Sequence, residues 1–281
     1  MASLDDAFYK LNRGKEHVSQ FLSNIKLTLD QYYLETGIKS KPYTKPSNST
    51  DPRSWEAFTI YCPSIPYIDK KDEILLGEAL QSFRSSLDYL AWAWVAESAK
   101  KSGVSLKKQQ EKKVMFPMSS TVKAFKGNVG HLLPNVSANQ RAFIRLYQPY
   151  RRSDAGRAMR YLNTLSNTDK HRIIVPALMS PQVGDVEFKI NPSLECVKEI
   201  HHLSVKREIN AGTKIITVVL AGSVPPNQPS VHVDTKLILM PMLPKSIVGL
   251  TPSRDIILVE DALTLISTIC TEILTKAKER F

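Results

Sequence analysis

The sequence is poor in glycine, and the glycine-dependent motifs of several enzyme classes are missing. Only 11 of the 281 residues are glycine. None of them belongs to the glycine-rich loop that cradles nucleotide phosphates or to the G-x-S-x-G turn of serine hydrolases. The H-E-x-x-H pair of zinc proteases is absent as well. Hydrolysis of nucleoside triphosphates and dinucleotide chemistry are therefore not predicted.

Cysteines and long apolar runs are also scarce. Cys62, Cys196 and Cys270 lie far apart without the spacing of a zinc site, which is typical of reduced thiols in a cytosolic protein. The longest apolar runs, such as IITVVLA, are much shorter than a bilayer span. The N-terminal residues MASLDDAFYKLNRGKEH lack the apolar core of a secretion signal. We therefore expect a soluble, cytoplasmic protein with no membrane partner.

Acidic residues are outnumbered by basic ones. The chain has 38 lysines and arginines against 27 acidic residues, which gives a formal net charge of +11. A charge of this sign indicates an anionic partner such as RNA, although composition alone does not choose among anionic partners. The lysine-rich stretch 100–113 can contact phosphates, but it has no aromatic ring on which a base could stack. Its other interpretation is a solvated helix end or loop.

The sequence does contain a series of amphipathic helical patterns. Apolar residues recur at helical spacing over residues 5–34, 72–100, 155–172 and 259–281, and a shorter helix is predicted around NQRAFIRLYQPY. The pattern over 72–100 has two apolar stripes, so this helix is expected at the centre of a bundle. Its main stripe is Leu76, Leu80, Phe83, Leu87, Leu90 and Trp94, and its second is Ser85, Tyr89, Trp92 and Ala96.

Strand patterns occur in two places. WEAFTIYC predicts a short strand near residues 55–62, and runs such as TKIITVVLAG and VHVDTKLILMPM predict antiparallel strands over residues 176–250. The predicted fold class is α+β, a helical bundle with an inserted small antiparallel β-sheet before the C-terminal helix. Residues 1–175 then form the bundle core with the short strand, residues 176–250 the β segment, and residues 251–281 a C-terminal helix that packs back on the bundle.

The segment NTLSNTDKHR, residues 163–172, places polar residues at the end of an apolar helix pattern. Four ionisable side chains in succession are expensive to bury, so they indicate either a working site or a solvated helix end. Continuing the helical geometry puts Asp169 on the apolar face with Arg172 beside it. Asn167 and His171 fall on the other side.

Four segments carry a resemblance to known proteins. LLGEALQSFRSSLDYLAW, IRLYQPY and YLNTLSNTDKHR, with FPM between the first two, and RGKEH near the N-terminus resemble an uncharacterised bacterial family with Arg-Ser-x-Leu-Asp-His-Leu and Asp-Lys-His-Arg motifs. The first segment is also similar to the Arg-x4-His motif of HEPN ribonucleases, helical bundles in which the arginine acts on the RNA phosphate and the histidine transfers protons. The resemblance implies the phosphate-binding role for Arg84, and Tyr89 stands in place of the histidine.

A tyrosine at this position is a poor proton shuttle at neutral pH, because its ordinary pKa is about 10. His171 or His17 can replace the histidine if the bundle brings one of them near Arg84, with Lys170 or Arg172 stabilising the charge that develops on the phosphate. On this interpretation Arg84 and His171 are the catalytic residues. The supporting polar cluster is His17, Asp88, Tyr89, Asn167, Asp169, Lys170 and Arg172.

A structural interpretation uses the same charged residues. Arg84 and Asp88 are spaced i and i+4 along one edge of their predicted helix. They can pair with Asp169 and Arg172 across the bundle, forming a buried ion network that fixes the register of the helices.

A metal site would draw on His17, Asp88, Asp169 and His171, which have the right ligand chemistry. However, the Glu-x-x-His pairs of helical metal sites are absent, and His171 faces away from Asp169. Neither a metal nor a cofactor is therefore predicted.

The sequence leaves two functions open, and with them the question of whether the chain is an enzyme. The first is a HEPN-like protein that interacts with RNA or another nucleic acid, as a ribonuclease or in an altered, degenerate form. The second is a non-catalytic protein- or ligand-binding module, in which the charged residues form a structural ion network and the β segment presents the binding surface. The sequence predicts neither the substrate nor the oligomeric state.

Overall fold

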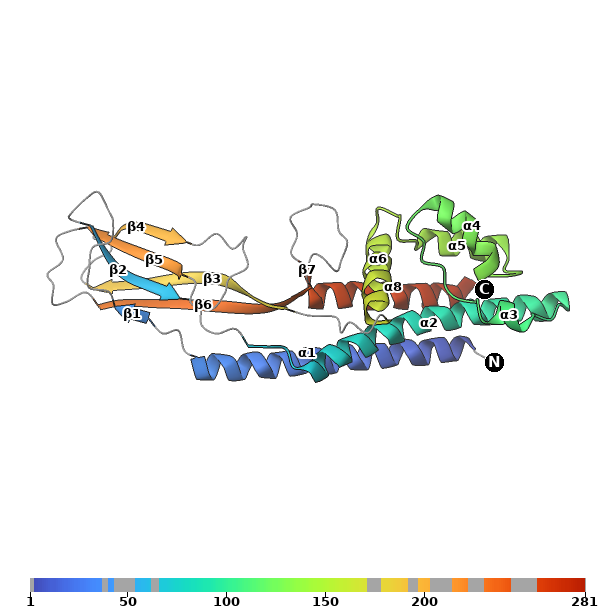
Figure 1. The fold of residues 1–281 in the computed structure, drawn as a ribbon, viewed down its shortest axis with the longest axis horizontal. Coiled ribbons are helices and arrows are strands. Elements are labelled where there is room, and N and C mark those ends of the chain that lie inside the picture. Colours follow the sequence, from blue (N-terminus) through green and yellow to red (C-terminus); the bar gives the residue numbers. More distant parts are fainter. Residues whose placement is uncertain are drawn as a thin grey trace. The chain divides into compact units, whose positions relative to one another are not determined.

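In the computed structural model the chain forms two compact units (Figure 1). The helical unit comprises Met1–Ile25, Ile68–Ala177 and Met242–Phe281, and the second unit comprises Lys26–Tyr67 and Leu178–Pro241. The structure describes residues 3–36, 40–42, 54–61, 66–170, 178–191, 197–202, 214–221, 230–243 and 257–280.

The helices belong to the helical unit, except that the first continues beyond Ile25 into the second. They are α1 (Leu4–Thr36), α2 (Lys70–Ser102), α3 (Lys108–Glu111), α4 (Val122–Leu132), α5 (Ala138–Leu146), α6 (Asp154–Lys170) and α8 (Val259–Arg280). Within the unit α2 packs against α6 and α8, and α6 packs against α8. The helices α3, α4 and α5 lie toward the end of the unit at which the C-terminus is marked (Figure 1).

The central helix α2 has well-defined ends and two apolar faces. The Asp69 carboxylate accepts a hydrogen bond from the Lys71 N–H at its start, and this bond holds the pKa of the Asp69 carboxyl below its usual value. Gly103 ends the helix in the left-handed conformation at φ 65°, which glycine adopts without strain. All residues of the predicted main stripe are buried and those of the second stripe are half-buried, so the predicted central helix is confirmed.

Close contacts join α1 to α2 within the helical unit. A Cβ added at Gly14 would lie 2.8 Å from Cε1 of Phe83 and 3.3 Å from the backbone oxygen of Ala79. Further along, Asn24 Nδ2 donates to Asp72 Oδ1 over 2.6 Å. Since a side chain at position 14 would meet a fully buried ring, glycine is what lets these two helices approach.

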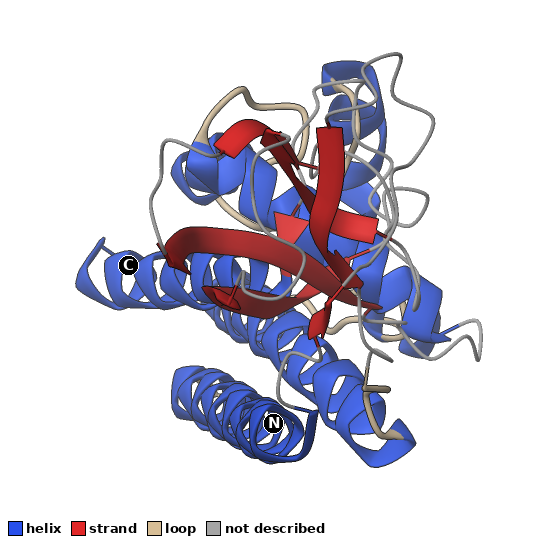
Figure 2. Ribbon diagram, turned by 90° about the vertical axis from the view of Figure 1, so that its left-hand side faces the viewer, coloured by secondary structure: helices blue, strands red, loops and turns tan. Residues whose placement is uncertain are grey.

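The strands form two sheets, drawn in red in Figure 2. In the four-stranded sheet the order is β1-β2-β5-β4, with Trp55 opposite Leu220 and Ile60 opposite Ile216. The three-stranded sheet has the order β3-β6-β7. The strands are β1 (Ser40–Pro42), β2 (Ser54–Tyr61), β3 (Leu178–Asn191), β4 (Val197–His202), β5 (Lys214–Ala221), β6 (Ser230–Leu243) and β7 (Ile257–Leu258).

The predicted α+β fold, a bundle with one small sheet inserted before the C-terminal helix, is wrong. Apart from the two-residue β7 and the end of β6, the regular secondary structure in the described part of the helical unit is all helical. This is the unit that carries Arg84 and Asp88. The four-stranded sheet takes β1 and β2 from the N-terminal part of the chain rather than from residues 176–250 alone. Strand propensity shows that a segment can be extended but not which distant segment pairs with it.

None of the described helices combines the length and the apolar character needed to cross a membrane.

The contact at Gly14 predicts opposite effects for two glycine substitutions. Gly14→Val should lower the free energy of unfolding by about 1–3 kcal/mol, because the new side chain overlaps the buried Phe83 ring. Gly127→Ala is the matched control in α4, where an added Cβ meets nothing within 4 Å, and it should raise stability by up to about 1 kcal/mol through helix propensity. Urea unfolding followed by far-UV circular dichroism measures both. A Gly14→Val protein as stable as wild type would contradict the close α1–α2 approach.

Candidate functional site

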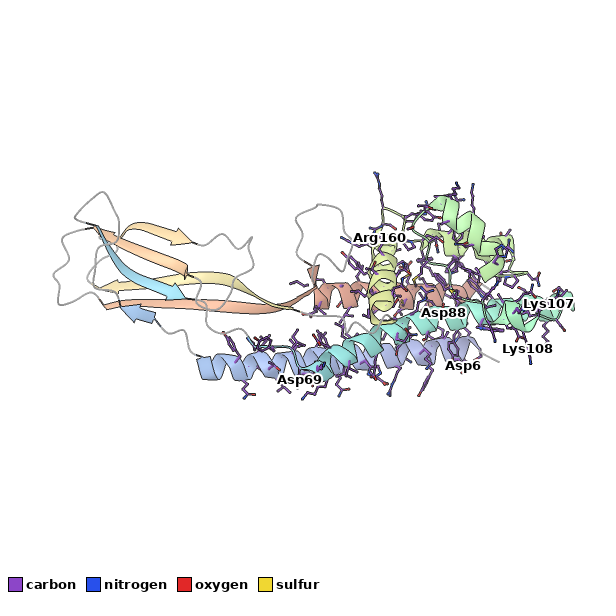
Figure 3. All side chains as sticks on the ribbon, viewed as in Figure 1. Asp6, Asp69, Asp88, Lys107, Lys108 and Arg160 are labelled. Atoms are coloured by element: carbon purple, nitrogen blue, oxygen red, sulfur yellow. The ribbon has the colours of Figure 1, made fainter. Side chains whose placement is uncertain are left out.

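Arg84 and Asp88 hold the backbone of one buried residue, Phe116. The Nη2 group of Arg84 donates to the Phe116 carbonyl oxygen over 3.1 Å, and the Phe116 N–H donates to Asp88 Oδ1 over 2.8 Å. The two side chains also pair with each other, with 3.4 Å between Arg84 Nε and Asp88 Oδ2. Figure 3 labels Asp88 on α2. The pair therefore satisfies both backbone polar groups of Phe116, whose side chain is fully buried.

This arrangement has a clear physical cause. A buried carbonyl or N–H without a partner costs about 1–3 kcal/mol, and bonds to charged partners are the stronger ones. Arg84 itself is only 7% exposed, so its charge needs both the Asp88 carboxylate and the Phe116 carbonyl in order to be buried. The residue predicted to bind phosphate thus has a structural task in the fold.

Gln148 holds the irregular stretch that follows Phe116, through hydrogen bonds to Pro117 and Ser119. Its Nε2 group donates to the Pro117 carbonyl over 2.8 Å, and its Oε1 accepts from the Ser119 N–H at 3.0 Å. Gln148 is fully buried and also donates to Ile144 in α5. The segment 114–119, which contains the FPM motif, is therefore fixed between α2 and the end of α5.

The other predicted site residues are dispersed among the described helices. His17, on α1, is buried with its Nδ1 3.6 Å from Glu78 Oε2. Tyr89 is half-buried on α2, and Asn167 is exposed on α6. Within the described part of the chain, none of these three residues forms a hydrogen bond or an ion pair with Arg84 or with another of the three.

The remaining predicted residues fall at the end of α6. Asp169 and Lys170 are helical in backbone, and their side chains lie outside the described residues. His171 and Arg172 lie outside them altogether. The catalytic pair of Arg84 with His171 and the ion network reaching Asp169 stay predictions. Among the described residues, no three histidine, cysteine, aspartate or glutamate side chains come together as a metal site.

Sequence reasoning missed a larger feature, which is the placement of the positive charge. Residues 100–167 contain fourteen lysines and arginines and only two acidic residues, Glu111 and Asp154. The net charge of the whole chain is +11, so this basic segment carries all of the excess and the rest is close to neutral. A count of acidic residues along the chain would have found it. The basic side chains there are exposed or half-exposed.

Five arginines of this segment gather around the turn between α5 and α6, and we call them the arginine cluster. The Nε group of Arg151 donates to the Arg145 carbonyl over 3.2 Å, and Nη1 of Arg160 donates to the Arg151 carbonyl over 3.1 Å and to Pro149. Figure 3 labels Arg160 on α6. The members are Arg145, Arg151, Arg152, Arg157 and Arg160.

The arginine cluster is poorly neutralised. Arg157 pairs with Asp154, which is the first residue of α6 and the one acidic residue among residues 141–167. Arg145 and Arg152 are exposed and form no ion pair with any acidic residue whose side chain is described. An uncompensated group of guanidinium ions attracts anions, and the planar fork of each ion matches the geometry of phosphate oxygens.

Two titratable groups, Tyr147 just after α5 and Cys270 on α8, are poor nucleophiles. Tyr147 Oη donates to Glu272 Oε1 over 3.1 Å, and burial together with this carboxylate raises the pKa of the Tyr147 phenol well above its usual value. Burial also raises the pKa of the Cys270 thiol to about 12. Neither group is ionised near neutral pH, so neither supports nucleophilic catalysis.

Comparison with known proteins gives no match for this chain among protein-family models, curated proteins or solved structures.

The Phe116 contacts predict a coupled loss of stability. Arg84→Leu and Asp88→Leu should each lower the free energy of unfolding by about 1–3 kcal/mol, because each leaves a buried polar group of Phe116 unpaired. The double variant should lose less than the sum, since the two residues share this partner and each other. Lys101→Ala is the control, because it breaks an exposed ion pair with Glu97 and should cost less than about 1 kcal/mol. Strictly additive losses in urea unfolding would argue against the shared contact.

The buried Cys270 predicts a protected thiol. At pH 8 its thiolate fraction in the native protein should be about a thousandfold smaller than in the unfolded chain, because the pKa is raised from 9.0 to about 12. Alkylation by iodoacetamide should therefore be negligible until urea unfolds the protein. Peptide mass spectrometry measures the alkylation of Cys270 separately from that of the other two cysteines. Rapid alkylation of Cys270 in the native protein would show that it is not buried.

Proposed function

We propose that this protein binds RNA or another nucleic acid through the basic segment 100–167 and does not cleave it through Arg84. The observation that carries the proposal is the segregation of charge, with fourteen basic residues and two acidic ones in one stretch of the helical unit. We also propose a cytoplasmic location, which suits the buried Cys270 thiol without a disulfide partner.

Phosphate backbones are the polyanions that such a surface suits best. Each lysine or arginine that neutralises a phosphate releases a condensed counterion, so several contacts together give strong, salt-dependent binding. An excess of positive charge also speeds association with a negatively charged partner. The absence of acidic residues over most of the segment favours a partner with many charges rather than a small anion.

The proposal keeps the HEPN resemblance in its degenerate form, which is a protein that binds nucleic acid but does not use the motif to cleave it. Arg84 is the residue that matches the ribonuclease motif, yet its guanidinium is buried against Asp88 and the Phe116 carbonyl. Tyr89 replaces the motif histidine. Both observations favour a structural Arg84 and a binding function, which combines the first predicted function with the structural ion pair of the second.

The proposal predicts a specific loss of binding when charges in the segment are removed. A variant with Lys107, Lys108, Arg145 and Arg152 changed to Gln should bind labelled RNA at least about tenfold more weakly and with a salt slope smaller by up to about four. The control variant changes the exposed residues Arg13, Lys26, Lys70 and Lys71 to Gln, which removes the same charge elsewhere, and should stay within about twofold of wild type. Fluorescence anisotropy at several salt concentrations measures both.

Two outcomes would contradict the proposal. Equal losses in the two variants would mean that only the total charge matters, and no RNA binding by the wild-type protein would remove the function itself. A denaturing gel of the same mixtures tests the non-catalytic part. Cleavage that is lost in a correctly folded Arg84→Lys protein would restore the ribonuclease interpretation.

A further inference from the structure

We infer that the nucleic acid bound by the basic segment is a duplex, recognised through its phosphate backbone rather than through unstacked bases. This inference rests on the proposed function and specifies its partner. It comes from two features of the segment, namely where its aromatic rings lie and how its arginines are held.

The first feature is that none of the six phenylalanine and tyrosine rings of the segment is fully exposed to solvent. Phe116, Phe125, Phe143, Tyr147 and Tyr161 are all buried, none of them more than 7% exposed. The sixth ring, Tyr150, is half-buried, with the Arg151 guanidinium 5.9 Å from its centroid and Phe125 against its edge at 6.5 Å. The basic segment therefore has positive charge at its surface, and five of its six phenylalanine and tyrosine rings lie in the interior.

This separation disfavours single strands. Proteins that bind single-stranded nucleic acid gain about 1–3 kcal/mol for each base that stacks on an aromatic side chain. Without a fully exposed phenylalanine or tyrosine ring, the attraction comes mainly from the phosphates. A duplex carries one charge per roughly 1.7 Å of its axis and releases more counterions per contact than a single strand does. Phosphate-only binding therefore favours the duplex.

The second feature is that two arginines of the cluster hold the turn that carries it in place before any ligand binds. Arg151 and Arg160 are bonded to backbone carbonyls at positions 145, 149 and 151, which ties the α5–α6 turn together. A preorganised surface loses little entropy when it binds. A stiff duplex likewise has little to lose, whereas a flexible single strand would have to be ordered along the cluster.

The inference is tested with four fluorescent probes of about 20 nucleotides per strand, a length over which a duplex carries about 40 phosphate charges. They are an RNA duplex, a DNA duplex of the same sequence, and one unstructured single strand of each. We expect the RNA duplex to bind at least about tenfold more tightly than the RNA single strand, which corresponds to about 1.4 kcal/mol. Equal binding of both duplexes would support recognition of the phosphates alone, and preference for the RNA duplex would support recognition of its A-form backbone.

A substitution that adds a ring tests the reason for the preference. Leu146 lies beside Arg145 and is 51% exposed, so Leu146→Tyr places a stacking surface within the arginine cluster. This variant should bind the single strands several-fold more tightly and leave duplex binding unchanged. Ile74→Tyr is the matched control, because Ile74 is also 51% exposed but lies outside the basic segment. It should change neither affinity.

The possible failures are distinguishable. If the single strands bind as tightly as the duplexes, the inference is overturned while the proposed function stands. If none of the four probes binds, both are overturned. If Leu146→Tyr leaves single-strand binding unchanged, the missing rings are not the cause of a duplex preference, and this account of it is overturned.

Discussion

A buried backbone must have both of its polar groups paired, and in the helical unit this requirement is met at Phe116 by Arg84 and Asp88. The pairing sets which turn of α2 lies against the irregular segment 114–119. Gln148 then connects that segment to the end of α5. Two charged residues and one amide thus position a stretch of chain that has no regular hydrogen bonding of its own, and the turn that bears the arginine cluster follows directly after Gln148.

This use of Arg84 changes how its motif is interpreted. An arginine that acts on a phosphate must present its guanidinium to the ligand, whereas this one is directed to a carbonyl and a carboxylate inside the protein. A structural role and a catalytic role would compete for the same donors. The residues suited to meet an anion are instead those that the core does not use, such as the exposed Arg145 and Arg152. Packing and interaction are therefore assigned to different arginines of the same unit.

The sequence predicted those parts of the structure that leave a periodic pattern of residues, and it missed those that do not. The stripe that includes Leu80 and Leu87 predicted a central helix correctly, because burial repeats with the helical period. α4 had no such signal, since Phe125 is its one buried residue. The Phe116 contact was invisible for another reason, because every residue has a carbonyl and no side-chain pattern identifies which one is paired. The antiparallel pairing of β2 with β5 depends on contacts between distant segments, which strand propensity does not report.

The uneven distribution of charge also affects how the helical unit is oriented before it contacts another molecule. Its excess positive charge belongs to one segment, of which α3, α4 and α5 lie toward one end of the unit (Figure 1). Such a distribution has a large electric dipole moment, so a polyanion exerts a torque on the unit as well as an attraction. The torque acts over about one Debye length, which is roughly 8 Å at physiological ionic strength. Within that distance a polyanion would turn the basic end of the unit toward itself, so the proposed binding would begin from a larger share of collisions.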